Sequence, residues 1–236
     1  TGDAGAGKSS LINAITGGRT AKTGVKETTK EPTEYTHPKN ERIKLWDLPG
    51  IGAPSCPNLE TYFKKVDLEK YDTFVIVTAT RFTENNLRLA RKVESMNKSF
   101  FLVRTKIDQD IDNEYHDNQK DEKSTLRKIK EDCRKNLGNL AASTRNTFLI
   151  SNRHKDKWDF PSLTQAILDA LPPHQRESLI LSLTSNCKNF IKRKVEVLRG
   201  RIWMVAAASA AVAAVPVAGL SAAFDFDLLL NEMDFY

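Results

Sequence analysis

The stretch that decides the fold of this chain is Gly2-Asp3-Ala4-Gly5-Ala6-Gly7-Lys8-Ser9. Its spacing is G-x-x-x-x-G-K-S, which is typical of a loop that wraps the phosphates of a nucleoside triphosphate. Glycines let such a loop curl until successive backbone N–H groups point inward at the phosphates. Ser10–Ile15 then reads as a helix whose positive N-terminal end faces the same phosphates. The stretch predicts nucleotide binding, but by itself it does not say which nucleotide.

Two side chains of this loop have chemistry of their own. Lys8 can reach the β- and γ-phosphates as a point charge, and the Ser9 hydroxyl can ligate Mg²⁺. We therefore expect the whole loop and the first helical turn to contact the nucleotide, namely Gly2, Asp3, Ala4, Gly5, Ala6, Gly7, Lys8, Ser9 and Ser10.

The composition indicates a soluble globular protein, with 40% hydrophobic and 28% charged residues among 236. All 36 Lys and Arg residues lie at or before Arg201, whereas four of the 30 Asp and Glu residues follow it, so residues 1–201 carry a net charge of +10. This excess could attract polyphosphates, anionic lipid or nucleic acid, or be an ordinary solvated surface. No aromatic-rich RNA motif accompanies it, and we expect no nucleic-acid partner. Three widely spaced cysteines and four histidines without zinc-ligand spacing predict neither a disulfide framework nor a zinc site.

Short apolar runs alternate with helical patterns up to Pro172-Pro173, which predicts an α/β fold with a mostly parallel sheet. We expect helices at about 58–70, 84–97, 122–136 and 161–171, and a loop over Asp108–Asp121. The expected strands are Ile43–Trp46, Thr73–Thr78, Phe100–Arg104 and Thr147–Ile150, with an edge strand at Glu34–His37.

The chain beyond the two prolines reads as purely helical. We therefore expect a first domain at residues 1–172 and part of an all-α domain at 173–236. Ile202–Phe224 carries no charged residue, but Pro216 and Gly219 interrupt it. Its apolar length leaves three readings: two packed helices at Ile202–Val215 and Leu220–Asp234, which we favour, a membrane-spanning helix, or a hairpin in one leaflet.

Two further motifs indicate that the predicted nucleotide is GTP. Asp47-Leu48-Pro49-Gly50 ends a strand about forty residues after the phosphate loop, where Asp47 can hold Mg²⁺ through water and the Gly50 N–H can meet the γ-phosphate. Thr105-Lys106-Ile107-Asp108 follows another strand. An aspartate there accepts two hydrogen bonds from guanine, the lysine stem stacks on the base, and adenine offers no matching donors.

Weaker signals complete the predicted site. Ser151-Asn152 follows the last strand and is placed to offer a backbone N–H to guanine O6. Thr28 and Thr29 lie in the polar segment where a threonine ligates Mg²⁺ only in the triphosphate state, and we prefer Thr29. No glutamine that could orient a water follows Gly50, because the next residues are Ile51–Pro54. Turnover is therefore very slow, or the missing group comes from elsewhere, such as another copy of the protein.

These residues together resemble the immunity-related GTPases, a family of interferon-inducible proteins, and the lysine at Lys8 is similar to the members that keep it. The resemblance includes Asp47–Gly52, Tyr71–Phe74 with Thr78–Phe82, and Phe101–Asp108. It implies a Ras-like G domain joined to a helical domain, binding of GTP and GDP with Mg²⁺, and self-assembly that activates hydrolysis. It also implies a role for Glu27 with Thr29 in that assembly, and peripheral association of a cytoplasmic protein with endomembranes (ER or Golgi) or pathogen vacuoles.

The same resemblance implies that a strand precedes the phosphate loop at the centre of the sheet, between the Ile43 and Thr73 strands. We expect this chain to be a piece that lacks that strand, to show a gap or a closed-up sheet there, and to be marginally stable alone. The main function hypothesis is a self-assembling GTPase. The alternatives are a nucleotide-gated scaffold with negligible hydrolysis, a membrane-anchored protein, and, more distantly, an ATPase or nucleoside kinase.

Overall fold

The computed structural model describes residues 1–24, 29–37, 40–137, 147–171, 176, 180 and 188–213. The chain divides into two compact units, Thr1–Cys187 and Lys188–Tyr236. The domain boundary predicted at Pro172-Pro173 falls outside the described residues and stays a prediction.

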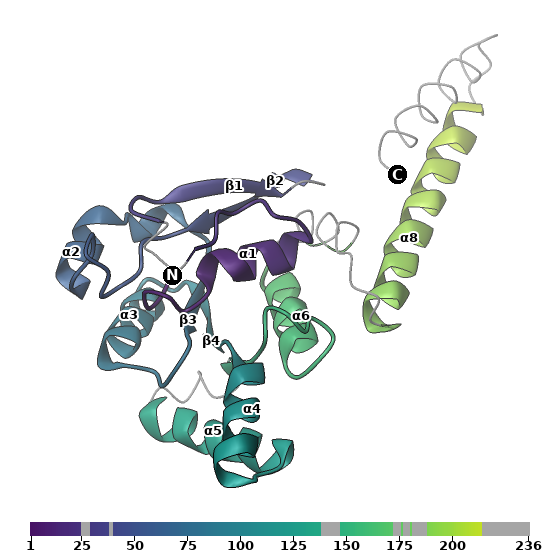
Figure 1. Cartoon of the computed structure of the whole chain (residues 1–236). Helices are drawn as coiled ribbons and strands as arrows, with labels where there is room; N and C mark the ends of the chain where they lie inside the picture. Colours follow the sequence, from purple (N-terminus) through teal and green to yellow (C-terminus); the bar gives the residue numbers. More distant parts are fainter. Residues whose placement is uncertain are drawn as a thin grey trace. The chain divides into compact units, whose positions relative to one another are not determined.

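Three parallel strands form the central sheet of the first unit, in the order β3-β4-β5 (Figure 1). β3 spans Thr73–Thr78, β4 spans Ser99–Arg104 and β5 spans Thr147–Leu149. Each is a short run of apolar and β-branched residues, as expected for parallel strands that helices cover on both faces. Three of the five predicted strands form this sheet, with ends shifted by one residue in β4 and β5.

The two faces of this sheet carry separate hydrophobic clusters, because side chains alternate along each strand. Phe74, Ile76 and Leu102 belong to the larger cluster, together with residues of α2, α3, α4 and α5. Val77 and Val103 point to the other face, where the smaller cluster contains residues of α1 and α6. The helices of the first unit are α1 (Lys8–Thr16), α2 (Leu59–Lys65), α3 (Glu84–Ser95), α4 (Ile107–Asn118), α5 (Glu122–Leu137) and α6 (Phe160–Ala170).

The helix predicted at 58–70 is interrupted. α2 ends at Lys65, and a separate 3-10 turn, η1, spans Leu68–Lys70. Val66 leaves the helix in an extended conformation to bury its side chain in the core, and the Asp67 carboxylate then caps the new turn by accepting from the Glu69 N–H. Core packing therefore overrides the helical pattern at this point.

The loop predicted over Asp108–Asp121 is wrong, because most of it is helix α4. Ile107 is fully buried and Ile111, one turn later, packs against the same core, so the helix has an apolar stripe among its many acidic residues. Glu114 ties it to the following segment through ion pairs with Lys120 and Lys128. The segment is so polar that its helical spacing of apolar residues rests on Ile107 and Ile111 alone, and the sequence pattern therefore did not reveal the helix.

A second, antiparallel pair of strands is formed by β1 (Thr33–His37) and β2 (Asn40–Asp47). It shares no strand pairing with the three-stranded sheet. Residues 1–4 lie where the two sheets approach: Gly2 pairs in parallel with Val77 of β3, and the Ala4 N–H donates to the Ile51 carbonyl just beyond β2. The sheet is therefore divided between β2 and β3, at the place where the family resemblance implied a gap.

A groove of about 450 Å³ lies at this division. β2 contributes Ile43 and Leu45 to its walls, β3 contributes Thr73 and Val75, and α1 contributes Ile15. The edges of β2 and β3 thus face a largely apolar groove, which Thr1 also lines.

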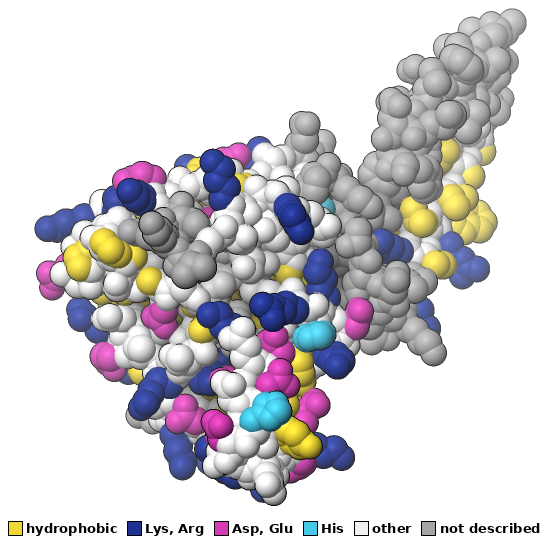
Figure 2. Space-filling view, viewed as in Figure 1, with side chains coloured by type: hydrophobic (Ala, Val, Ile, Leu, Met, Phe, Trp, Pro, Cys, Tyr) yellow, Lys and Arg dark blue, Asp and Glu magenta, His cyan; other side chains and the backbone are white. Residues whose placement is uncertain are grey.

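The second unit is described for one helix, α8 (Lys188–Ala213). It is continuous through Gly200–Ile202, so the separate helix predicted to begin at Ile202 does not begin there, and the helix predicted at 220–234 lies outside the described residues. Trp203, Met204 and Ile202 are exposed, and Figure 2 shows hydrophobic side chains gathered on this helix. Within the described part of the chain, no helix has the length and apolar character needed to cross a membrane.

Candidate nucleotide-binding site

The phosphate loop of residues 2–7 has the backbone that its glycines predict. Gly2, Gly5 and Gly7 have φ angles of 122°, 72° and 83°, a region that side chains with a Cβ rarely enter. At Gly2 there is also no space, because a Cβ would lie 2.1 Å from the Val77 carbonyl oxygen. The loop therefore lies directly against β3, and any larger residue at position 2 would push it away.

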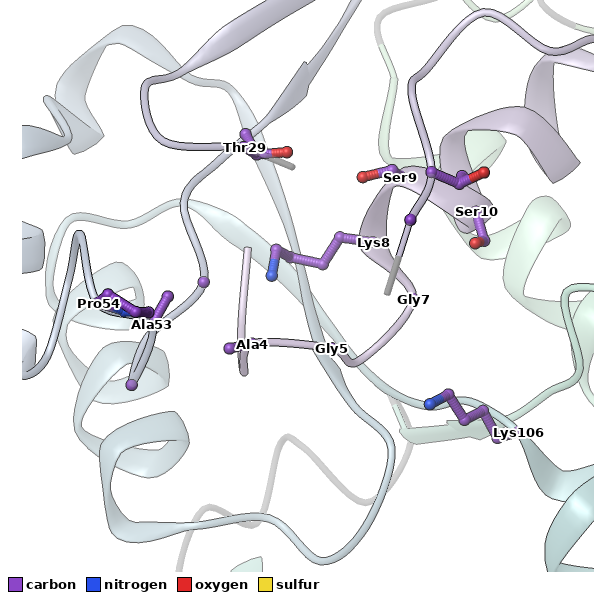
Figure 3. Close-up of a pocket in the computed structure, with 14 residues that line it drawn as sticks. Ala4, Gly5, Gly7, Lys8, Ser9, Ser10, Thr29, Ala53, Pro54 and Lys106 are labelled. Atoms are coloured by element: carbon purple, nitrogen blue, oxygen red, sulfur yellow. The ribbon is translucent and has the colours of Figure 1, made fainter. Parts of the chain in front are cut away.

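Helix α1 begins at Lys8, directly after this loop, and Gly7 supplies no side-chain cap. The first N–H groups of a helix have no partner within it, so the uncapped start of α1 offers donors and a positive dipole end. The N-terminal residues of α1 line a cavity of about 450 Å³, and Figure 3 shows the Lys8 side chain extending into it. The Lys8 ammonium donates to the Asp3 carbonyl oxygen at 2.9 Å, so it lies over the loop it belongs to.

Two hydroxyl residues that line this cavity, Ser9 and Thr29, meet on a buried carboxylate that does not itself line it. Asp47, the last residue of β2, is 1% exposed, and its Oδ2 accepts hydrogen bonds from Ser9 Oγ at 2.5 Å and Thr29 Oγ1 at 2.8 Å. Its Oδ1 is buried and has no hydrogen-bond partner among the described residues. A carboxylate and two hydroxyls are ligands that suit Mg²⁺, and Oδ1 is an acceptor that no described side chain uses. The residues predicted to hold Mg²⁺ are thus brought together and are chemically suited to it.

Gly50 faces the phosphate loop at close range. A Cβ at Gly50 would lie 2.7 Å from the Ala4 Cα, so only glycine allows this approach. The Ile51 N–H donates to the Gly2 carbonyl, which fixes the segment after β2 to the loop. The next stretch, Gly52–Pro54, lines the cavity and carries no polar side chain.

The residues predicted to read guanine lie at the ends of β4 and β5. The Ile107 N–H donates to the Ile150 carbonyl, which holds the two strand ends side by side. Lys106 has a left-handed backbone (φ 61°) and lines the cavity, whereas Asp108 is half-buried in the first turn of α4. Ser151 is buried, and its Oγ accepts from the Arg153 N–H.

Two side chains from these strand ends bind the phosphate loop directly. Thr105 Oγ1 donates to the Ala6 carbonyl at 2.7 Å, and Asn152 Nδ2 donates to the Gly7 carbonyl at 3.0 Å. The sequence placed Thr105 among the nucleotide-contacting residues and gave Ser151-Asn152 a backbone N–H for guanine O6, and these assignments stay predictions; it did not show that the Thr105 and Asn152 side chains hold the loop. These two hydrogen bonds connect the ends of β4 and β5 to the phosphate loop.

Some predicted site residues lie elsewhere or outside the described part. Glu27 and Thr28 fall outside the described residues, and their predicted roles stay predictions. Asp3 is in the loop, but its side chain contacts Thr78 and Asn86 instead of lining the cavity. Sequence reasoning missed these two partners, and the available signal was an asparagine on the buried side of α3. The described residues contain no cluster of three or more His, Cys, Asp or Glu that could hold a metal.

The fold, the phosphate loop, the segment after β2 and the ends of β4 and β5 together define the class of protein: a P-loop nucleotide-binding protein with the segments of a G domain. A family model for interferon-inducible GTPases matches residues 1–236. The chain is 38% identical to interferon-gamma-inducible GTPase 10 of Mus musculus, in an alignment that covers 92% of this chain and 54% of that protein. It is 37% identical to interferon-inducible GTPase 5 of Rattus norvegicus, with coverage of 100% and 52%. This chain belongs to the interferon-inducible GTPase family.

The chain spans about half the length of these two curated relatives. Among solved structures, the FeoB G-domain from Methanococcus jannaschii matches 72% of this chain and 92% of that chain, with a TM-score of 0.39 at 21% sequence identity.

Proposed function

We propose that this protein binds GTP and GDP together with Mg²⁺ and hydrolyses GTP to GDP and phosphate. The observation that carries the proposal is the meeting of Ser9 and Thr29 on one buried carboxylate oxygen of Asp47, beside an uncapped helix start. Family membership supports the same activity. The proposal concerns the whole protein, of which this chain contains the G-domain loops.

Different residues of the site would bind Mg²⁺, stabilise the developing negative charge and contact the γ-phosphate. Ser9 and Thr29 would ligate Mg²⁺, with Asp47 behind them, and the bound ion would neutralise charge on the β- and γ-phosphates. Lys8 and the loop amides stabilise the negative charge that develops on the bridging oxygen as the γ-phosphate leaves. Gly50 lies against Ala4, where its N–H can contact the γ-phosphate and register its loss.

Selection of guanine rests on the strand ends. Asp108 accepts two N–H groups of the base, the Lys106 stem packs on its face, and the Ser151-Asn152 backbone meets guanine O6. Adenine would leave the Asp108 carboxylate poorly paired. Competition of labelled GTP by unlabelled GTP and ATP tests this: we expect displacement by GTP alone, and equal displacement by ATP would contradict guanine selection.

We propose that hydrolysis is assisted by self-association through the G domain. Among the described residues that line the cavity beside Gly50, Gly52–Pro54 offers no side chain to orient water. A second copy could supply that group, and the family resemblance assigns Glu27 to this contact. Specific activity should rise with protein concentration, and flat activity from dilute to micromolar protein would rule out assistance by a second copy.

The absence of a polar side chain at Gly52–Pro54 favours one alternative function, a nucleotide-gated binding or scaffold module with negligible hydrolysis. Single-turnover measurements on the full-length protein separate the two functions. Phosphate release faster than nucleotide dissociation supports the GTPase, whereas bound GTP that remains intact supports the scaffold.

In cells we propose a role in interferon-linked cell-autonomous immunity, as a cytoplasmic protein bound peripherally to endomembranes or pathogen vacuoles. The relatives named as interferon-inducible GTPases support the link to interferon. No nucleic-acid partner is proposed, and Figure 2 shows Lys and Arg side chains interspersed with acidic ones on the visible face. Carbonate extraction of cell membranes should release a peripheral protein, and retention would favour an inserted segment.

A further inference from the structure

Asp3 belongs to the phosphate loop, yet its side chain turns away from the cavity. One carboxylate oxygen, Oδ2, accepts hydrogen bonds from Thr78 Oγ1 at 2.8 Å and from Asn86 Nδ2 at 3.1 Å. Thr78 ends β3 and Asn86 lies in the first turns of α3. Asp3 therefore ties the loop to a strand and a helix at once.

The backbone of Asp3 makes equally specific contacts. Its N–H donates to the Val77 carbonyl at 3.0 Å, and its carbonyl oxygen accepts from Lys8 Nζ at 2.9 Å and from the Ala6 N–H at 3.3 Å. The residue that anchors the loop to the core is thus also the residue on which the Lys8 ammonium rests.

Both partners of the carboxylate are buried, with 0% of Thr78 and of Asn86 exposed. Thr78 Oγ1 also lies 3.2 Å from the Arg81 carbonyl oxygen, whereas Asn86 Oδ1 is buried without a hydrogen-bond partner among the described residues, so Asn86 depends on its Nδ2 contact with Asp3 more than Thr78 does. A hydrogen bond to a carboxylate is stronger than one between neutral groups, and a buried amide left unpaired is costly. The contact is therefore too specific to be a solvated surface pair.

We propose that Asp3 is a positioning residue for the phosphate-binding step, a role that rests on the proposed binding of GTP and GDP. Three glycines with left-handed backbones make this loop adaptable in the absence of an anchor. The Asp3 carboxylate fixes its first half to Thr78 and Asn86, so that the following amides and Lys8 face the phosphates. Thr105 and Asn152 fix its second half through the Ala6 and Gly7 carbonyls.

Loss of the Asp3 carboxylate should weaken the phosphate contacts of the nucleotide more than its base contacts. A displaced loop loses its hold on the β-phosphate, whereas the guanine contacts at the ends of β4 and β5 stay in place. Removal of the Asp3 carboxylate should therefore weaken GDP binding much more than GMP binding. A general loss of folding would weaken both nucleotides alike.

The test is a competition assay on the full-length protein, in which unlabelled GDP and GMP displace fluorescent GDP. We expect Asp3→Ala and the near-isosteric Asn86→Leu each to raise the Kd for GDP about tenfold or more, and the Kd for GMP less than about threefold. Asp3→Asn should bind GDP nearly as the unsubstituted protein does, because the amide oxygen can accept both hydrogen bonds. Asn85→Leu, at a half-buried neighbouring position on α3, is the matched control and should change neither Kd.

Unchanged GDP binding in Asp3→Ala, or equal weakening of GDP and GMP, would overturn the positioning role while leaving nucleotide binding intact. Failure of the unsubstituted protein to bind GDP would instead overturn the proposed function, and the positioning role with it. If Asn86→Leu fails to fold, Thr78→Val removes the other donor with little change in volume, and the same Kd ratio decides the question.

Discussion

At the scale of single residues, Asp108 is the side chain expected to set base specificity. Replacing its carboxylate by an amide, in Asp108→Asn, puts an N–H group where guanine also presents N–H groups. Two charge-assisted hydrogen bonds are lost, each contributing about 1.5–3 kcal/mol, so GTP affinity should fall by roughly two to four orders of magnitude. Xanthine nucleotides should bind more tightly to the variant than GTP does, as measured by competition with a fluorescent nucleotide.

The control for this change is Asp112→Asn, on an exposed position of the same helix. It removes the same charge one turn further along α4 and should leave GTP binding unchanged. GTP binding unaltered in Asp108→Asn would show that Asp108 does not contact the base.

Thr29 is the residue expected to distinguish GTP from GDP. Its hydroxyl is 2.8 Å from Asp47 Oδ2, and Thr29 itself is only 9% exposed. Thr29→Ala should raise the Mg²⁺ concentration needed for half-maximal GTP hydrolysis by about tenfold, because one Mg²⁺ ligand is lost. GDP affinity should remain unchanged, and Thr33→Ala, an exposed threonine on β1, serves as the matched control. An equal loss of GDP and GTP affinity would assign Thr29 to loop structure and not to the metal.

The sequence predicted the position of most of these residues, because their motifs combine a residue type with the end of a strand. Ser9, Thr29 and Asp47 were expected to meet, and the structure places them within hydrogen-bonding distance, although their role in binding metal stays a prediction. The contacts of Asp3 could not be predicted. Its position tolerates many residues in the loop pattern, and nothing local shows that the carboxylate faces Asn86, which is 83 residues later in the chain.

At the scale of elements, helix α4 shows how composition can hide a helix. The helix ends at Asn118, and the next residue, Gln119, is its C-cap and has a left-handed backbone with φ 50°. Glycine adopts this conformation without the strain that a side chain adds, so Gln119→Gly should raise the free energy of unfolding by about 1 kcal/mol. Asn113→Gly, at an exposed position inside the helix, should lower it by about 1 kcal/mol. Thermal melts that show the same sign for both changes would contradict the helix.

Helix α5 contains the buried Cys133, and the reactivity of its thiol depends on how tightly the helix is packed. Burial is the main cause that raises the pKa of the Cys133 thiol from 9.0 to about 11, and Arg104 opposes it by a smaller amount. At pH 8 the folded protein should therefore react with a thiol reagent about a hundredfold more slowly than an exposed cysteine. The thiol is protonated more readily in the folded state, so its contribution to stability is present below pH 9 and is lost as the pH rises toward 11.

A variant that carries only this thiol, Cys56→Ser with Cys187→Ser, isolates the signal. Full reactivity at pH 8 without denaturant would show that α5 opens readily, and the ordinary rate in guanidinium chloride calibrates the comparison.

At the scale of the whole molecule, the divided sheet is the feature with the largest expected effect on stability. β2 and β3 are not hydrogen-bonded to each other, and an apolar groove of about 450 Å³ separates their facing edges. The Thr1 N–H already donates to the Val75 carbonyl, and Gly2 pairs with Val77 in parallel, so residues 1–3 have the direction of a strand between β2 and β3. The family resemblance implied a gap at this place, whereas the groove's walls depend on long-range packing that no local sequence pattern shows.

A strand that is added before residue 1 and continues residues 1–3 into the groove should therefore stabilise residues 1–236. About five added residues would pair with both edges and bury about three apolar side chains, each contributing about 1.5–3 kcal/mol before the entropy of ordering is subtracted. We expect a net gain of about 3 kcal/mol, or a Tm rise of about 6–12 °C for a domain of this size. An extension of equal length made of alternating Pro and Gly is the control, because proline cannot donate to either ladder. A Tm that rises equally with both extensions, or a cooperative melt of soluble residues 1–236 at the same Tm as the extended chain, would show that the groove needs no strand.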